Sequence, residues 1–414
     1  MDTVMDYVKD ETRDFTEYPF HAPDALVFAL LSYDRIPGQV PRLARLEERY
    51  GTLGRRVKSF NPRHPFKSVR SLWSVPYDGV TLRHVEEELA EHEALDPDYD
   101  MHPGLVDPRI AHSFYRSTSR NPRFAVCEMN AADEQFDEDR QTQFAAVTFR
   151  LPTDTLVIAF RGTDDSLVGW REDFNMSFQY PVPAQREAAD YLDRVADFWP
   201  GRIVLTGHSK GGNLAIYAAM NARDDVKDRI EQIYSLDGPG FQQPVIASYE
   251  YSTVADRVTK IVPEYSIIGM LLEAPKDEHR IVVTSSVDGL MQHSGFTWQM
   301  RGDRFNTVPD VAESSRTFNA AVNAWLSGMT QRQREHAVKA LFRVLESSGQ
   351  ANVSGLMSGG LGVLPGMVGS YVGLNGEERK YINQAMRLLA TAAFNHSPSQ
   401  TDESNTDDGP TGPQ

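Results

Sequence analysis

Residues 203–214 constrain the fold of this chain more than any other stretch. They read Ile-Val-Leu-Thr-Gly-His-Ser-Lys-Gly-Gly-Asn-Leu and contain the pattern G-x-S-x-G at Gly207, Ser209 and Gly211. The apolar run before the pattern predicts a buried strand, and the apolar spacing after it predicts a helix. Such a turn holds its serine in a strained conformation, and side chains at either glycine would collide with the crossing strand and helix. The stretch therefore favours a nucleophile elbow at Ser209 over a glycine-rich turn whose serine only caps a helix.

Charge and cysteine content limit the partners and the compartment. The formal net charge of −16 argues against a nucleic-acid partner and against nonspecific attraction to anionic membranes. Cys127 is the single cysteine, so no intrachain disulfide and no cysteine-based metal site can form. The first residues lack the basic and apolar regions of a secretory signal. We therefore expect a cytoplasmic protein, with no metal and no organic cofactor.

Helix and strand patterns alternate through the middle of the chain. We expect a helix at 185–198 and strands at 124–129, 144–151, 155–160, 203–205, 230–236, 258–262 and 281–285. This alternation is typical of an α/β fold with a doubly wound, mostly parallel sheet. The pattern of 144–151 predicts one exposed face, whereas the unbroken apolar run 156–160 suits the sheet interior.

The chain is expected to divide into four parts. Residues 1–122 form helices and loops that pack on the core, including a buried helix over 24–33. Residues 123–305 form the α/β core, and 306–396 form a helical C-terminal region. Residues 397–414 consist of the polar and turn-forming residues typical of a disordered tail.

Two segments outside the core have unusual composition. Residues 347–376 carry no charge, but their many glycines favour a lid or close helix packing over a membrane span. Contact with a membrane surface through this stretch stays open. Residues 51–80 are basic, and 86–100 are acidic with interspersed histidines. The acidic segment lacks ordered ligand spacing, so we interpret it as a solvated helix face and loop rather than a metal site.

A serine nucleophile needs a histidine base, and one histidine is well placed. Downstream of Ser209 the chain has His279, His293, His336 and His396. His279 precedes the last expected strand, and the other two lie in a charged helix and beside the tail. His293 follows that strand, where the base is expected.

The orienting acid and the oxyanion hole follow from the same sheet geometry. Asp237 and Glu264 both lie after intervening strands, and either could orient the imidazole of His293. The tight Gly-Pro-Gly turn after Asp237 favours it, but the choice stays open. For the oxyanion hole we expect the N–H of Lys210 and a second N–H from the turn at Gly162 and Thr163. The Lys210 side chain is expected to be solvated rather than substrate-binding.

Several motifs together resemble a known family. Phe160-Arg-Gly-Thr-Asp and Gly169-Trp-Arg-Glu-Asp-Phe resemble the F-R-G-[ST] and W-x-x-D signature of class 3 (fungal-type) lipases. The segments GHSKGGNLA, LDGPGF, VPEYSIIGMLL and QHSGFTW are more similar still to a bacterial, Mbeg-like branch of lipase-related proteins. The resemblance covers about residues 20–345.

This resemblance implies an α/β-hydrolase fold, Ser209 as nucleophile, His293 as base and an oxyanion contribution from Thr163. Arg161, Trp170 and Asp173 are interpreted as scaffolding around the oxyanion turn. One position departs from the pattern, because Lys260 stands where class 3 lipases carry their acid. The class 3 acid therefore cannot be carried over. An acid after the earlier strand, as in pancreatic-type lipases, favours Asp237.

The sequence thus predicts a serine hydrolase of lipase or esterase type, acting on a small-molecule or lipid ester through an acyl-enzyme on Ser209. Two alternatives stay open. One is an idle hydrolase fold that serves as a binding or regulatory module, and the other is a thioesterase or acyltransferase with the same nucleophile. The oligomeric state does not follow from the sequence.

Overall fold

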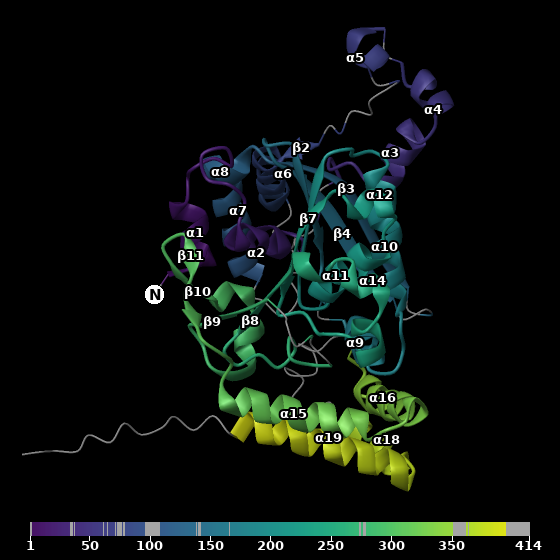
Figure 1. Ribbon diagram of the computed structural model, residues 1–414. Helices are drawn as coiled ribbons and strands as arrows, with labels where there is room; N and C mark the ends of the chain where they lie inside the picture. The colour runs from purple at the N-terminus through teal and green to yellow at the C-terminus, as the bar shows by residue number, and fades with distance from the viewer. Residues whose placement is uncertain are drawn as a thin grey trace, which may run out of the picture.

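A computed structural model describes residues 2–394, except 34, 35, 37, 61, 64, 71, 73–76, 78, 96–107, 138, 140, 141, 165, 273, 274, 276–278, 351–361 and 363 (Figure 1). The tail predicted at 397–414 lies outside the described residues, as does part of the glycine-rich stretch 347–376.

The secondary structure has these bounds. The strands are β1 (Asp2–Thr3), β2 (Val80–Thr81), β3 (Glu128–Asp137), β4 (Thr142–Arg150), β5 (Thr155–Phe160), β6 (Arg202–His208), β7 (Ile230–Leu236), β8 (Val258–Pro263), β9 (Arg280–Val283), β10 (Gln299–Arg301), β11 (Arg304–Phe305) and β12 (Thr307–Val308). The α-helices are α1 (Val4–Asp10), α2 (Ala22–Leu31), α3 (Leu43–Tyr50), α4 (Leu53–Lys58), α5 (Pro65–Arg70), α6 (Leu82–Leu95), α7 (Pro108–Arg120), α8 (Pro122–Ala125), α9 (Leu167–Asn175), α10 (Pro183–Ala196), α11 (Lys210–Asn221), α12 (Asp224–Lys227), α13 (Gln243–Ile246), α14 (Tyr249–Ser252), α15 (Glu313–Ser327), α16 (Gln331–Glu346), α18 (Leu364–Gly373) and α19 (Gly376–Phe394). Short 3₁₀ helices are η1 (Ala255–Arg257), η2 (Gly289–His293) and η3 (Gly295–Thr297).

A large central sheet of nine strands has the order β12-β9-β8-β7-β6-β5-β4-β3-β2. The strands from β5 to β9 pair in parallel, and the pairings at both edges are antiparallel. A mixed α/β fold with a mostly parallel sheet is therefore present. The doubly wound topology is wrong, because from β2 to β9 each strand lies beside the next one in the chain and the order does not reverse.

Helices nevertheless cover both faces of this sheet. Ile158 and Leu205 belong to the core under the crossover helices α10 and α11. Val157 and Val204, on the other face, pack with the N-terminal helices. Right-handed crossovers between strands in an unreversed order place their helices on one face. The second face needs another cover, which α1, α2 and α7 supply (Figure 1).

Two local expectations differ from the structure. Residues 122–125 form a helix instead of a strand, because Asn121 caps the N–H of Arg123 (2.7 Å) and Pro122 opens the helix. The strand begins later, at Glu128, and continues as β3 to Asp137, eight residues beyond the predicted end at 129. The face of β4 expected to be exposed is buried, since β4 lies inside the sheet with helices over both faces.

A buried ion pair attaches the N-terminal helices to the core. Asp24, in α2, and Arg123, in α8, are fully buried and form a salt bridge of 2.6 Å. Asp24 also accepts a hydrogen bond from the Tyr7 hydroxyl (2.8 Å). The Arg123 guanidinium donates to the carbonyls of Arg13 (2.7 Å) and Tyr18 (2.8 Å). These contacts satisfy both charges away from water.

The C-terminal helices lie together at one end of the molecule, beside α9 (Figure 1). Ala340 and Val344 of α16 pack with Leu374 and with Ile382 of α19 in a small separate core. No helix in the described part of the chain combines the length and the apolar character needed to cross a membrane. The central sheet extends beyond 123–305 at both edges, through β2 and β12, and the four-part division of the chain stays a prediction.

Replacing Asp24 by Ala should lower the free energy of unfolding by about 3–5 kcal/mol, because the charge of Arg123 would stay buried without its partner. Urea unfolding measures this loss. The exposed pair of Glu335 and Lys339 (2.6 Å) gives a control, and Glu335→Ala should cost less than about 1 kcal/mol. A similar small loss for both variants would contradict the structural role of the buried pair.

Candidate active site

Ser209 lies in a sharp turn between β6 and α11. Its backbone angles are φ 58° and ψ −133°, in a region that residues with side chains rarely adopt. A Cβ at Gly207 would collide with the backbone of Gly211, and one at Gly211 would collide with the carbonyl of Phe160. The two glycines thus allow the close crossing of strand and helix that the sequence predicts. Ser209 exposes 8 % of its surface in this structure.

Asp237 and His293 are in direct contact. Nδ1 of His293 lies 2.6 Å from Oδ2 of Asp237, which is fully buried after β7. The other carboxylate oxygen of Asp237 accepts from the Ser266 hydroxyl (2.5 Å) and the Gly269 N–H (3.1 Å). An ionised carboxylate only accepts hydrogen bonds, so it favours the histidine tautomer with the proton on Nδ1. The lone pair of Nε2 is then available to take a proton.

Glu264, the alternative acid, is engaged through its backbone. Its N–H donates to Val283 (2.9 Å), and its carbonyl accepts from Ala312 (2.9 Å). Glu264 itself is partly exposed. Among the described residues, its carboxylate makes no contact with His293. Of the two carboxylates, the structure brings Asp237 to the histidine.

Three contacts hold the segment that carries His293. The Trp298 indole donates to the Gln292 carbonyl (2.8 Å), and the Gln292 side chain accepts from the Tyr265 N–H (3.0 Å). Nε2 of His208 lies 2.7 Å from the His293 carbonyl, and the two imidazole rings lie 4.7 Å apart. His293 is therefore held beside the residue that precedes Ser209.

His208 acts here as a neutral donor. Its Nε2 must carry the proton that the His293 carbonyl accepts, which leaves Nδ1 to accept from the Tyr33 hydroxyl (3.0 Å). Burial, together with the nearby His293, lowers the pKa of His208 to about 3. Sequence reasoning missed both His208 and Tyr33. The only signal was the position of His208 inside the elbow motif.

The turn after β5 lies against the elbow. A Cβ at Gly162 would come within 3.0 Å of the Ser209 Cβ and would collide with Tyr33 and His208. The N–H groups of Thr163 and Lys210 have no hydrogen-bond acceptor within the described part of the chain. Free N–H groups beside a serine are what an oxyanion hole requires. The two donors named from the sequence thus lie on segments that flank Ser209.

The Lys210 side chain is buried, so the expectation of a solvated lysine is wrong. Its Nζ forms a salt bridge with Glu172 (3.0 Å) and donates to the Gln143 carbonyl (2.9 Å). Burial disfavours the charged form, but Glu172 and Asp173 raise the pKa of Lys210. Glu172 also accepts from the N–H groups of Gln143 (3.1 Å) and Ala184 (2.9 Å). Glu172 lies inside the W-x-x-D motif, yet sequence reasoning gave it no role.

Asp173 links the turn that carries Thr163 to the start of the helix that carries Lys210. Its Oδ2 accepts from the Thr163 hydroxyl (2.5 Å), and its Oδ1 lies 3.7 Å from Nζ of Lys210. Burial raises the pKa of Asp173 to about 6, against the opposing effect of Lys210. The scaffolding interpretation of Asp173 and Arg161 is compatible with these contacts, since Arg161 pairs with Glu134 (3.0 Å) on β3.

Helix α15 supports the loop that holds Asp237. Ser315 and Asn319 donate to the carbonyl of Ser266 (2.5 and 2.9 Å). Asn323, one turn further, accepts from the Leu272 N–H and donates to its carbonyl (both 3.1 Å). The three side chains recur every fourth residue and so form one polar stripe on the helix. The C-terminal region thereby contacts the loop that lies against Asp237.

One known protein family matches the segment that contains this site. A sequence model of the Mbeg1-like family matches residues 118–343, which is more than half of the chain and includes every predicted site residue. The chain belongs to the Mbeg1-like family. A search of curated proteins finds no significant match.

Two solved lipases are similar to this Mbeg1-like chain over part of their length. The native Rhizomucor miehei lipase propeptide complex is 20% identical, with a TM-score of 0.28, and the alignment covers 39% of this chain and 57% of that chain. M37 lipase is 17% identical, with a TM-score of 0.30, and the alignment covers 39% of this chain and 63% of that chain. The chain thus spans less than two thirds of either lipase.

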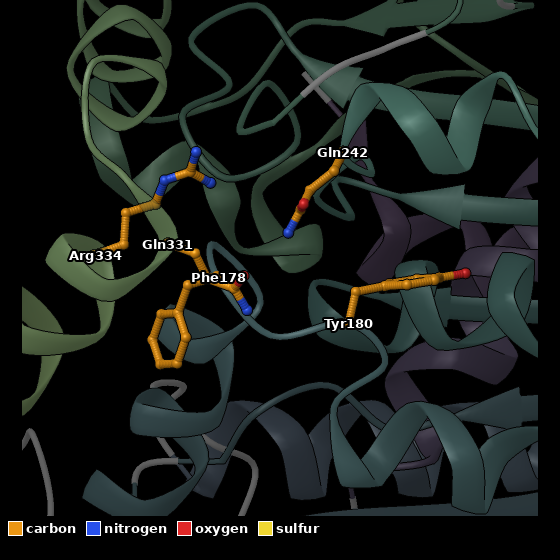
Figure 2. Close-up of a pocket in the computed structure, with 5 residues that line it drawn as sticks. All are labelled: Phe178, Tyr180, Gln242, Gln331 and Arg334. Carbon is orange, nitrogen blue, oxygen red and sulfur yellow. The ribbon is translucent and has the colours of Figure 1, made fainter.

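The region matched to the Mbeg1-like family also contains a polar hollow of about 270 Å³. Figure 2 shows Gln331 and Arg334 of α16 on one side and Gln242 on the other, with Phe178 and Tyr180 completing the lining. Arg334 donates to the Ser177 carbonyl (2.5 Å). None of the predicted catalytic residues lines this hollow, so we assign it no part in the chemistry of Ser209.

No group of three or more metal-ligating side chains gathers in the described part of this Mbeg1-like chain. Among the predicted site residues, His293 contacts the buried carboxylate of Asp237. The absence of a cofactor stays a prediction.

Replacing Asp173 by Asn should reduce the pH dependence of stability. Folding raises the pKa of this carboxyl from 3.8 to about 6, so the folded state binds the proton more tightly than the unfolded state. Its contribution to stability is therefore present at low pH and lost as pH rises through this interval. The unfolding temperature of the variant, relative to wild type, should rise from about pH 4 to about pH 7.

Thermal unfolding at several pH values measures this relative shift. Asp288→Asn changes an exposed carboxylate and serves as the control. If the difference between the Asp173 variant and wild type stays constant over the whole interval, the raised pKa is refuted.

Proposed function

We propose that this protein is a serine hydrolase of lipase or esterase type that cleaves carboxylic esters through an acyl-enzyme on Ser209. The observation that carries the proposal is the 2.6 Å contact between Asp237 and His293 beside the strained turn at Ser209. A histidine oriented in this way, next to a serine in an elbow, is the arrangement that acyl transfer uses.

The reaction follows from the protonation states. Nε2 of His293 takes the proton of the Ser209 hydroxyl as the oxygen attacks the ester carbonyl, and Asp237 stabilises the resulting imidazolium. The N–H groups of Thr163 and Lys210 stabilise the negative oxygen of the tetrahedral intermediate. His293 then gives its proton to the leaving alcohol. A water molecule, deprotonated by His293, then attacks the acyl-enzyme. His293 returns this proton to the Ser209 oxygen as the acid leaves, which restores the serine hydroxyl and the neutral imidazole.

We assign the chain to the α/β-hydrolase fold and to the bacterial relatives of class 3 lipases on the motifs around Phe160, Trp170 and Ser209. Its acid follows β7 at Asp237, whereas the class 3 position is held by the buried Lys260 in β8. The substrate is a small-molecule or lipid ester, and the compartment is the cytoplasm.

A fluorophosphonate probe tests the nucleophile directly. The folded wild type should be labelled on Ser209, Ser209→Ala should show no labelling, and His293→Ala should be labelled far more slowly. Wild-type protein that stays unlabelled while folded would overturn the enzymatic proposal and favour a binding module.

Hydrolysis of p-nitrophenyl esters of increasing chain length then tests the acid and the substrate. Asp237→Asn should lower kcat by about ten-thousand-fold, because the imidazole loses the partner that sets its tautomer. Glu264→Gln is the matched control and should stay within about twofold of wild type, since that carboxylate does not contact His293. Equal losses for the two variants would contradict Asp237 as the acid, and a flat response to all esters would favour a thioesterase or acyltransferase.

A further inference from the structure

A basic segment projects from the body of the protein. Residues 51–70, here called the basic arm, contain the two short helices α4 and α5 (Figure 1). In Figure 1 the arm lies at the opposite end of the molecule from α9, α15 and α16. The family match begins at residue 118, so the arm lies outside the matched region.

The charge of the arm opposes that of the whole chain. Residues 51–70 contain six Lys and Arg and no Asp or Glu, in a chain of net charge −16. Arg55 donates to the Glu47 carbonyl (2.8 Å), and Arg56 donates to the Tyr50 carbonyl (2.9 Å). Carbonyls carry no net charge, so these two bonds do not cancel the charge of either arginine, and Arg55 also interacts electrostatically with the Glu47 carboxylate. The arm therefore carries a local positive charge that can attract anionic membranes, although the net charge of the whole chain opposes such attraction.

Large apolar side chains are exposed among these cations. Leu53 is 64% exposed and Val57 55%, four residues apart on α4. Phe66 is 91% exposed and Val69 46%, three residues apart on α5, and Phe60 between the helices is 42% exposed. Spacings of three and four residues place such pairs on the same side of a helix. Several large apolar side chains exposed on one short segment are typical of an interaction site.

We propose that the basic arm binds the surface of an anionic phospholipid bilayer. Cations at a membrane surface are attracted to anionic headgroups, and apolar side chains beside them enter the headgroup and acyl boundary. Stable association needs two such signals together, which the arm supplies within twenty residues. Nucleic-acid binding would use the same cations, but it gives no reason to expose paired Leu, Val and Phe side chains. The inference is independent of the hydrolase chemistry proposed for Ser209.

Sedimentation with vesicles tests the proposal on the full-length protein. Vesicles of phosphatidylcholine with phosphatidylserine should bind the protein, vesicles of phosphatidylcholine alone should not, and added salt should weaken binding. Lys58→Glu with Arg70→Glu should reduce binding about tenfold or more, and Leu53→Ser with Phe66→Ser should do the same.

Matched variants elsewhere on the surface separate the arm from general effects. Arg332→Glu removes an exposed cation of α16, and Tyr249→Ser removes an aromatic side chain that is 79% exposed on α14. Both should bind like wild type. Because every substituted side chain is exposed, circular dichroism should show all variants folded.

Three outcomes overturn the proposal. The first is equal binding to both kinds of vesicle, and the second is vesicle binding that the arm variants do not change. The third is a protein that does not bind vesicles but uses the arm to bind RNA or DNA or to self-associate. Fluorophosphonate labelling of Ser209 should be unchanged in the arm variants, so failure here leaves the enzymatic proposal untouched.

Discussion

The strained turn at Ser209 is the constraint on which the rest of the site depends. A positive φ at a residue with a side chain costs about 1–3 kcal/mol and persists only when the surroundings hold it. Here the Ser209 N–H donates to the Leu236 carbonyl (2.8 Å), while Gly207 and Gly211 keep strand and helix too close for the turn to relax. The turn places Ser209 at the carboxyl ends of the parallel strands. Thr163 lies there after β5, and Asp237 lies there after β7.

Two buried ion pairs join parts of the chain that are far apart in sequence. Lys210 and Glu172 attach the elbow to α9 and to β4, and Asp24 and Arg123 attach the N-terminal helices to the second face of the sheet. Desolvation offsets most of the attraction in such pairs, so their net contribution to stability is small. Their effect is on geometry, because a shift of either partner leaves a charge buried and unpaired.

Local patterns predicted the elements of the core well, and non-local contacts account for the errors. The bounds of β5 and β7 were predicted to the residue, and in β5 the unbroken apolar run from Leu156 to Phe160 marks a fully buried strand. Asp237 was favoured from its rigid turn, and the structure brings it to His293. The Tyr33 to His208 contact joins residues 175 positions apart, and no periodicity signals such a pair. The prediction of a doubly wound sheet was wrong for the same reason. The helices that cover the second face of the sheet come from the N-terminal part of the chain, far from the strands in sequence.

The hydrogen bonds from α15 bear on the order in which the site is assembled during synthesis. Ribosomes release a chain from its N-terminus, so Ser209, Asp237 and the loop with Ser266 emerge before α15. Until that helix follows, the Ser266 carbonyl lacks the Ser315 and Asn319 donors that hold it in the finished protein. A nascent chain therefore has Ser209, Asp237 and His293 before the loop with Ser266 gains this support, and the last strand of the sheet, β12, ends seven residues before Ser315. Helix α15 thus adds the last contacts to the loop with Ser266, although none of its residues is among Ser209, His293 and Asp237.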